Sequence, residues 1–173
     1  MLSMAPATPE PPTASRDLWD SERDDELSRQ SFVLPCADSM LPAIRYAVRG
    51  ALNDFPRWRD AELIASEFAS TAVHDRHDDP RLGGLSIVIV RYPGCVRLEV
   101  SYYVNPEARP GWDAEAVEAF GLGLTIIREC SDRWGHGRYT RWDHSGVIED
   151  RQTWYAELTC TESRDADSCA RRA

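Results

Sequence analysis

The chain has 173 residues and a formal net charge of -9, with 42% apolar and 28% charged residues. This length suits one domain with a hydrophobic core, and the composition is that of an ordinary globular protein. The acidic balance argues against a nucleic-acid-binding protein, which needs a basic face, and favours protein or nucleotide partners. All 20 basic residues are arginines, which excludes mechanisms that depend on a lysine, such as P-loop and Schiff-base chemistry.

The cysteines and the N-terminal segment indicate where the protein resides. The five cysteines are odd in number and widely spaced, so the sequence predicts neither a disulfide framework nor a zinc knuckle. A reducing cytoplasm suits this pattern best. The N-terminal segment lacks a charged region followed by an apolar run, and no apolar run approaches membrane-spanning length. We therefore expect a cytoplasmic protein with no membrane or nucleic-acid partner.

A single domain is expected between two tails. Residues 1–30 are rich in proline and charged residues and are expected to be disordered. Residues 161–173 are expected to form a second, frayed tail. The domain at 31–160 begins with a short strand at Ser31–Leu34. Two helices follow, because their apolar residues recur at helical spacing. The first is capped by Asp38 or Ser39 and closed by Pro56, and the second runs from about Arg59 to Val73.

Two strands and a long loop come next. Leu85–Arg91 is almost continuously apolar, and Val96–Val104 alternates between apolar and polar residues. Pro93-Gly94 between them predicts a hairpin turn. The loop at 105–120 is long enough to be a lid over a binding site.

A helix that opens with Gly-x-Gly follows this loop. The stretch reads GLGLTIIRECSDRWG from Gly121 to Gly135, and we expect the helix to run to Trp134-Gly135. Glycines at a helix N-terminus let an anion approach the backbone N–H groups. An ordinary glycine turn before an amphipathic helix is the alternative, because so short a motif is a weak signal. A hairpin formed by Arg138–Trp142 and Gln152–Leu158 ends the domain.

The order of these elements predicts an α/β (α+β) two-layer sandwich. Its sheet would be mixed and mostly antiparallel, and about three helices would cover one face.

This order and its motifs resemble the GHKL ATPase superfamily, the ATP-binding domain of histidine kinases, gyrase and the Hsp90 chaperone. Within that superfamily the chain is most similar to the small bacterial anti-sigma-factor serine/threonine kinases. The resemblance covers Ser31 to Leu158. It depends on the glycine box at Gly121–Gly135, on the helix segment SEFASTAVH at the place of the family's N box, and on the terminal strand TWYAEL.

The resemblance implies roles for particular residues. Glu67 matches the glutamate that activates the attacking hydroxyl, and Thr71 stands where the family has the asparagine that holds Mg²⁺. Tyrosines replace the adenine-binding acidic residue at the end of the preceding strand, and Tyr102 is the candidate there. Gly121, Gly123 and Leu124 are the candidates for binding the phosphates. Thr153 matches a threonine that lies near the adenine in the family.

Two functions remain open at this stage. The first is a regulator that binds ATP and Mg²⁺, phosphorylates a serine of an antagonist protein, and sequesters a sigma factor. As a possible protein kinase it would act in bacterial transcription control, and it could form a homodimer. The alternative is a non-catalytic protein-binding module that has kept the fold and lost the nucleotide. The replacements at Thr71 and Tyr102 favour this alternative, whereas Glu67 and the glycine box favour the first function.

Overall fold

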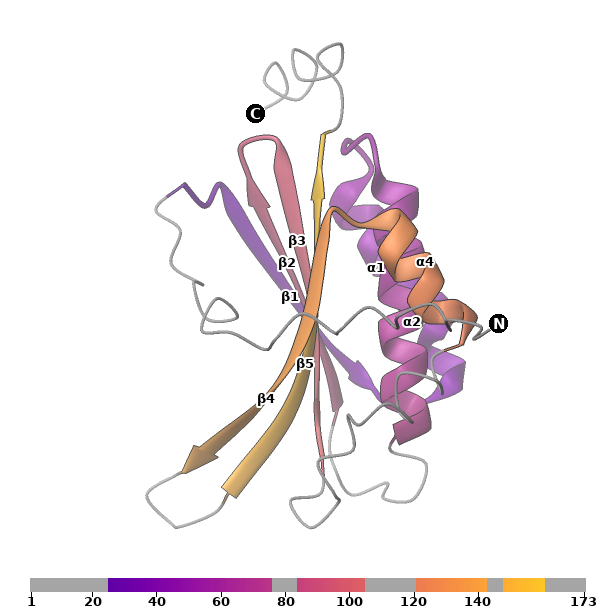
Figure 1. Cartoon of the computed structure of the whole chain (residues 1–173), viewed down its shortest axis with the longest axis vertical. Helices are drawn as coiled ribbons and strands as arrows, with labels where there is room; N and C mark the ends of the chain where they lie inside the picture. Colours follow the sequence, from indigo (N-terminus) through magenta and orange to yellow (C-terminus); the bar gives the residue numbers. More distant parts are fainter. Residues whose placement is uncertain (1–24, 76–83, 105–120, 143–147, 161–173) are drawn as a thin grey trace, which may run out of the picture.

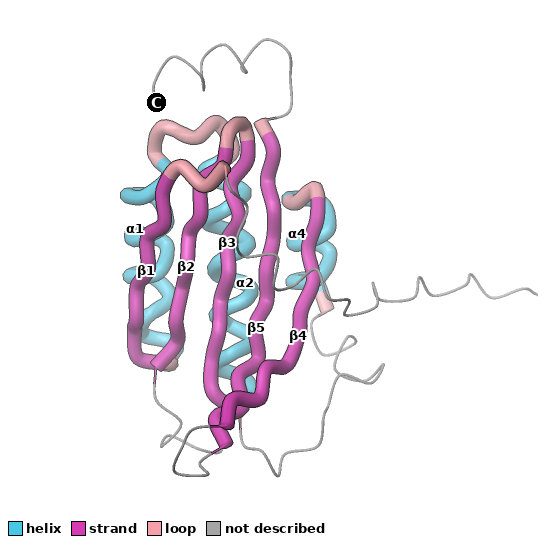
Figure 2. The backbone as a smooth tube through the Cα atoms, turned by 90° about the vertical axis from the view of Figure 1, so that its left-hand side faces the viewer, coloured by secondary structure: helices cyan, strands magenta, loops and turns pink. Residues whose placement is uncertain are grey.

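The computed structural model describes residues 25–75, 84–104, 121–142 and 148–160. Within these residues, one sheet forms the first layer and helices on one of its faces form the second (Figures 1 and 2). The predicted α+β sandwich is therefore confirmed. The predicted lid at 105–120, residues 1–24 of the predicted N-terminal tail, the predicted C-terminal tail at 161–173 and the turn of the last hairpin lie outside the described residues. The first strand already begins at Ser28, inside the predicted tail 1–30. The strands are β1 (Ser28–Pro35), β2 (Gly84–Tyr92), β3 (Cys95–Tyr103), β4 (Arg133–Trp142) and β5 (Ile148–Thr159), and the helices are η2 (Asp38–Met40), α1 (Leu41–Leu52), α2 (Trp58–Asp75) and α4 (Leu122–Cys130).

The strand order in the sheet is β1-β2-β3-β5-β4, so the last strand of the chain lies between β3 and β4. Every neighbouring pair of described strands is antiparallel. The sheet is thus more uniform than the mixed sheet that the sequence predicts. The β2–β3 hairpin is found as predicted, and Gly94 adopts a φ of 68° in its turn, a conformation that favours glycine.

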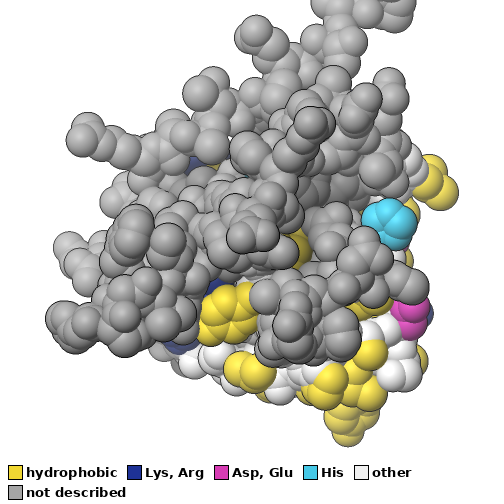
Figure 3. Space-filling model, turned by 90° about the horizontal axis from the view of Figure 1, so that it is seen from below, with side chains coloured by type: hydrophobic (Ala, Val, Ile, Leu, Met, Phe, Trp, Pro, Cys, Tyr) yellow, Lys and Arg dark blue, Asp and Glu magenta, His cyan; other side chains and the backbone are white. Residues whose placement is uncertain are grey.

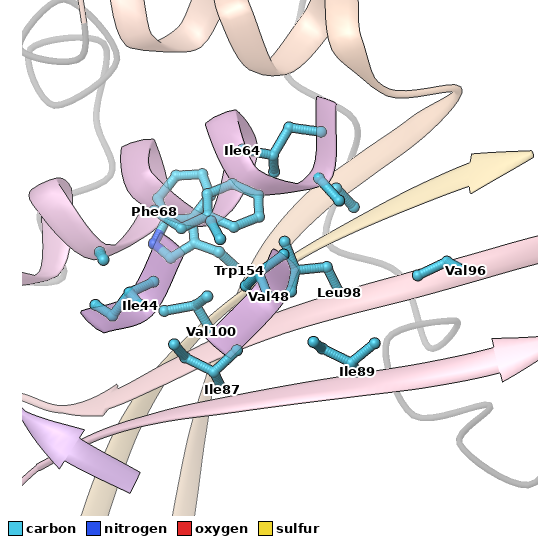
Figure 4. Packing of buried hydrophobic residues seen from close by; sticks show 14 of the residues in the cluster. Ile44, Val48, Ile64, Phe68, Ile87, Ile89, Val96, Leu98, Val100 and Trp154 are labelled. Atoms are coloured by element: carbon cyan, nitrogen blue, oxygen red, sulfur yellow. The ribbon is translucent and has the colours of Figure 1, made fainter. Parts of the chain in front are cut away.

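The hydrophobic core lies between the helices and one face of the sheet (Figure 4). The alternation in β3 is confirmed, because its apolar row is buried against the helices with at most 1% of each side chain exposed: Val96, Leu98, Val100 and Tyr102. Burial of each large apolar side chain contributes about 1.5–3 kcal/mol. The helices add their own buried stripes, from Ile44 to Leu52 in α1 and from Ala61 to Ala72 in α2.

An arginine organises the opposite face of the sheet, which we call the outer face. Arg97 donates to Glu99 at 2.6 Å and to Glu157 at 3.0 Å. Its guanidinium also lies 4.2 Å from the ring centroid of Tyr155. Arg97 is 8% exposed, so this face has a buried polar network where the alternation alone predicts solvated side chains.

The helix after the glycine box is shorter than predicted. It ends at Cys130, and Trp134-Gly135 already belong to β4. Long-range contacts end it, because the Asp132 carboxylate accepts hydrogen bonds from both the amide and the hydroxyl of Thr159 in β5. The expected strand from residue 138 is therefore only the second half of β4.

None of the described helices is both long enough and apolar enough to cross a bilayer.

Candidate functional site

Most of the predicted site residues lie on the helix side of the sheet. The second half of α2, the end of β3 and the start of β5 extend toward the lower end in Figure 1, and α4 begins at about mid-height. Helices α2 and α4 pack against each other. Figure 3 views the molecule from below and shows hydrophobic and histidine side chains at the surface.

Gly121 begins α4 in a conformation that only glycine adopts readily. Its φ is 48° and its ψ is -123°, and no side chain among the described residues caps the first turn. The first N–H groups of the helix therefore keep their capacity to bind an acceptor, and the helix dipole favours a negative one. Gly123 is buried, Leu124 is half-buried and Leu122 is 76% exposed.

Glu67 and Thr71 lie one turn apart on α2, and both side chains are half-buried. The Thr71 hydroxyl donates to the Glu67 carbonyl oxygen at 3.0 Å. This bond uses the hydrogen of the hydroxyl and leaves lone pairs on its oxygen. The Glu67 carboxylate and the Thr71 hydroxyl oxygen are thus two possible metal ligands on the same face of the helix.

The two oxygen ligands, Glu67 and Thr71, determine which metal ion the site could hold. Among the described residues, no group of three or more His, Cys, Asp or Glu side chains is arranged to hold a metal ion. Mg²⁺ is commonly bound by one or two carboxylates together with substrate phosphates. Glu67 and Thr71 therefore fit a magnesium ion that is bound together with a nucleotide, and they do not fit a protein-only metal site.

Tyr102 lies at the sheet end of this region, on the helix-facing side, and is 1% exposed. Close to this level, Phe68 of α2 and Trp154 of β5 pack with ring centroids 5.7 Å apart (Figure 4). The His136 ring lies 4.7 Å from that of Trp154. Burial lowers the pKa of His136, so the ring is neutral near neutral pH. Aromatic side chains from α2, β4 and β5 thus pack together between the helices and the sheet.

Thr153 is the one predicted residue that the structure separates from the others. It pairs with Ser101 in the β3–β5 register and lies on the outer face, where the two hydroxyls are 2.9 Å apart. The sheet stands between Thr153 and the helix-side residues. In β5 the helix-facing positions are instead Gln152 and Trp154, which oppose Tyr102 and Val100.

Gln152 was not among the predicted site residues. It is 2% exposed, and its amide nitrogen has no hydrogen-bond partner in the described part of the chain. The signal for its orientation is the phase of β5: Leu158 and Ala156 belong to the apolar row, so counting back by twos reaches Gln152.

Comparisons with known proteins address the fold. No family model matches the sequence, and a search of the curated proteins finds no match either. Among solved structures, the chain is similar to a chain in the crystal structure of the SiaB–SiaC complex from Pseudomonas aeruginosa, with a TM-score of 0.52 and 16% sequence identity. The match covers 78% of this chain and 91% of that chain. At this identity the likeness shows a shared fold, and function has to be argued from the site.

Proposed function

We propose that this protein is a nucleotide-binding regulator that acts through a protein partner, in the manner of the anti-sigma-factor serine/threonine kinases that it resembles. The observation that carries the proposal is the packing of two helices, α2 and α4, against each other. Helix α2 contains the oxygen ligands Glu67 and Thr71, and α4 begins with the glycine-opened N-terminus after Gly121.

Each part of this arrangement has a chemical task in binding a nucleotide. The N–H groups at the start of α4, which no described side chain caps, would hold phosphate oxygens, helped by the helix dipole. Mg²⁺, bound with the phosphates, would neutralise part of their charge, and Thr71 with Glu67 would provide oxygens beside it. In a phosphoryl transfer, Glu67 would accept a hydrogen bond from the attacking hydroxyl and orient it.

A protein partner is supported by two considerations. The similar solved chain comes from a complex of two proteins. The net charge of -9 also suits a protein partner better than a nucleic acid. We propose a sigma factor or its antagonist as the partner class. The site would phosphorylate a serine of the antagonist, or the protein would sequester its partner.

A substitution in α4 tests where the nucleotide binds. Gly123→Trp places an indole in the buried first turn of α4 and is expected to abolish ATP binding measured by isothermal titration calorimetry. Gly50→Trp is the matched control, because a Cβ at Gly50 in α1 would meet nothing within 4 Å. Equal ATP affinity of the two variants, with both folded by circular dichroism, would rule out α4 as the phosphate site.

One observation favours the second candidate, a protein-binding module without nucleotide. Tyr102 is fully buried, and Phe68 packs directly on Trp154, so large rings occupy the helix–sheet interface at this level. The expected outcome under that candidate is partner capture that is unaffected by ATP. Retention of a partner on a column with and without added ATP distinguishes the two.

A further inference from the structure

From Gln152 to Leu158, where the structure describes its side chains, the helix-facing row of β5 contains one polar residue. Trp154, Ala156 and Leu158 in this row are at most 1% exposed and belong to the hydrophobic core. Gln152 is the fourth member and is 2% exposed. Its amide nitrogen is shielded from solvent and donates no hydrogen bond to any group within the described residues. An unmet donor in a buried row lowers stability, so an apolar residue would serve the fold better.

The neighbours of Gln152 place this amide at the candidate site. Gln152 opposes Tyr102 in the β3–β5 register and precedes Trp154 by two positions on the same face. Both neighbours are aromatic and fully buried. The amide is thus on the side of the sheet that carries α2 and α4, next to the candidate residue Tyr102 in the register.

A polar pair on the outer face of the same two strands, Ser101 and Thr153, provides a comparison for Gln152. Ser101 and Thr153 are one residue away from Tyr102 and Gln152 and point to the other side. Their hydroxyls bond to each other at 2.9 Å, so each has a partner. Gln152 lacks such an arrangement, which indicates that its acceptor is supplied by something other than the described chain.

An amide beside aromatic rings suits the edge of a planar base. The side-chain amide of glutamine offers one acceptor and two donors in a single plane. A purine edge offers acceptor nitrogens next to an exocyclic donor or acceptor, and glutamine pairs with adenine through such an edge. We propose that Gln152 reads the base of the bound nucleotide, with its amide nitrogen donating to an acceptor of the purine. This inference rests on the proposed function and specifies which residue recognises the base.

Titration of two probes tests this role in the full chain. Gln152→Leu is compared with the wild type for binding of ATP and of inorganic triphosphate, and for thermal melting. The expected result is a higher melting temperature, because the unmet donor is gone, and a loss of ATP affinity of about 10-fold or more. Triphosphate affinity should stay at the wild-type value, because the first turn of α4 is unchanged.

Ser101→Ala is the control, because it removes a hydroxyl from the outer face and should leave ATP affinity unchanged. A second measurement on the wild type avoids any dependence on how a variant folds. The side-chain amide resonances of Gln152 in ¹⁵N-labelled protein should shift on addition of ATP, and should not shift on addition of triphosphate.

Two results would overturn the inference, and they differ from each other. If Gln152→Leu binds ATP as tightly as the wild type and the amide resonances do not move, Gln152 does not read the base, while nucleotide binding itself stands. If the wild type binds neither ATP nor triphosphate, the proposed function fails and this inference fails with it.

Discussion

The Thr71 hydroxyl donates to the Glu67 carbonyl oxygen at 3.0 Å, one turn back along α2. The hydrogen of this hydroxyl is used by the backbone, so its oxygen has lone pairs left for a cation. We predict that Thr71→Val, which keeps the shape and removes the oxygen, abolishes the dependence of ATP binding on Mg²⁺. The check is calorimetric titration of ATP with Mg²⁺ and with a chelator. Thr71→Asn should strengthen the dependence, since an amide oxygen reaches further.

The control for this prediction is Ser70→Ala, which removes an exposed hydroxyl from the adjacent position of α2. Its Mg²⁺ dependence should match that of the wild type. An unchanged Mg²⁺ dependence in Thr71→Val would show that Thr71 does not serve the metal.

A second prediction concerns Arg57, which joins three elements at the upper end of the molecule. Its guanidinium donates to the Asp132 carboxylate at 2.7 Å, to the Cys130 carbonyl at 3.0 Å and to Asp60 at 3.0 Å. Because the side chain is only 18% exposed, removing it leaves several acceptors poorly solvated. Arg57→Ala should lower the free energy of unfolding by about 2–4 kcal/mol, measured by urea denaturation.

A comparison within the same protein makes this prediction sharper. Arg49 forms a salt bridge with Glu62 at 2.7 Å, but its side chain is 54% exposed. The Arg49→Ala variant should therefore have a urea midpoint of unfolding close to that of the wild type. In a double-mutant cycle of Arg57 with Asp132, we expect a coupling energy of about 1–2 kcal/mol. A coupling near zero would contradict a direct contribution of this pair.

The third prediction is a pH dependence of stability. Burial lowers the pKa of the His136 imidazole below its ordinary value of 6.5. As the pH falls below about 6.5, His136 becomes protonated in the unfolded chain but stays neutral in the folded chain. Stability is therefore complete above that pH and declines toward the lowered folded pKa, by at most about 1.4 kcal/mol per pH unit. Urea denaturation at about pH 7.5 and about pH 5.5 measures the decline.

Two variants assign this decline to its source. His136→Gln removes the titrating ring and should reduce the difference between the two pH values. His74→Gln should keep the wild-type difference, because the His74 side chain is exposed at the end of α2. Equal pH dependence of all three proteins would mean that His136 is not the group responsible.

Two glycines give opposite predictions for the same substitution. A Cβ at Gly50 inside α1 would meet nothing, so Gly50→Ala should stabilise the fold by about 0.5–1 kcal/mol. A Cβ at Gly135 in β4 would stand 2.7 Å from the Tyr155 ring, which also packs under Arg97. Gly135→Ala should therefore destabilise it by about 1–3 kcal/mol. Thermal melting of both variants checks the signs.

The contrast between β3 and β5 shows how far the sequence allows the site to be predicted. In β3 the apolar and polar residues alternate clearly, and the helix-facing row from Val96 to Tyr102 is found as predicted. In β5 every residue from Gln152 to Leu158 is buried, because the Arg97 network also covers the outer row. Polarity then no longer marks the face, and the sequence does not reveal that Thr153 lies on the outer face.

The end of α4 could not be predicted for a similar reason. The apolar spacing of the helix continues to Trp134, but Asp132 is held by Thr159, more than 20 residues later in the sequence. Local periodicity contains no information about such a contact. The glycine opening of α4 was predictable, because a φ of 48° at Gly121 is a local requirement that the residue type reveals.

The most direct test of the central claim is a calorimetric titration of the full chain with ATP, in the presence of Mg²⁺ and in the presence of a chelator. We predict saturable binding of one ATP per chain that weakens when Mg²⁺ is removed. An absence of binding at millimolar ATP, by a chain that is folded by circular dichroism, would contradict it and would favour the protein-binding module.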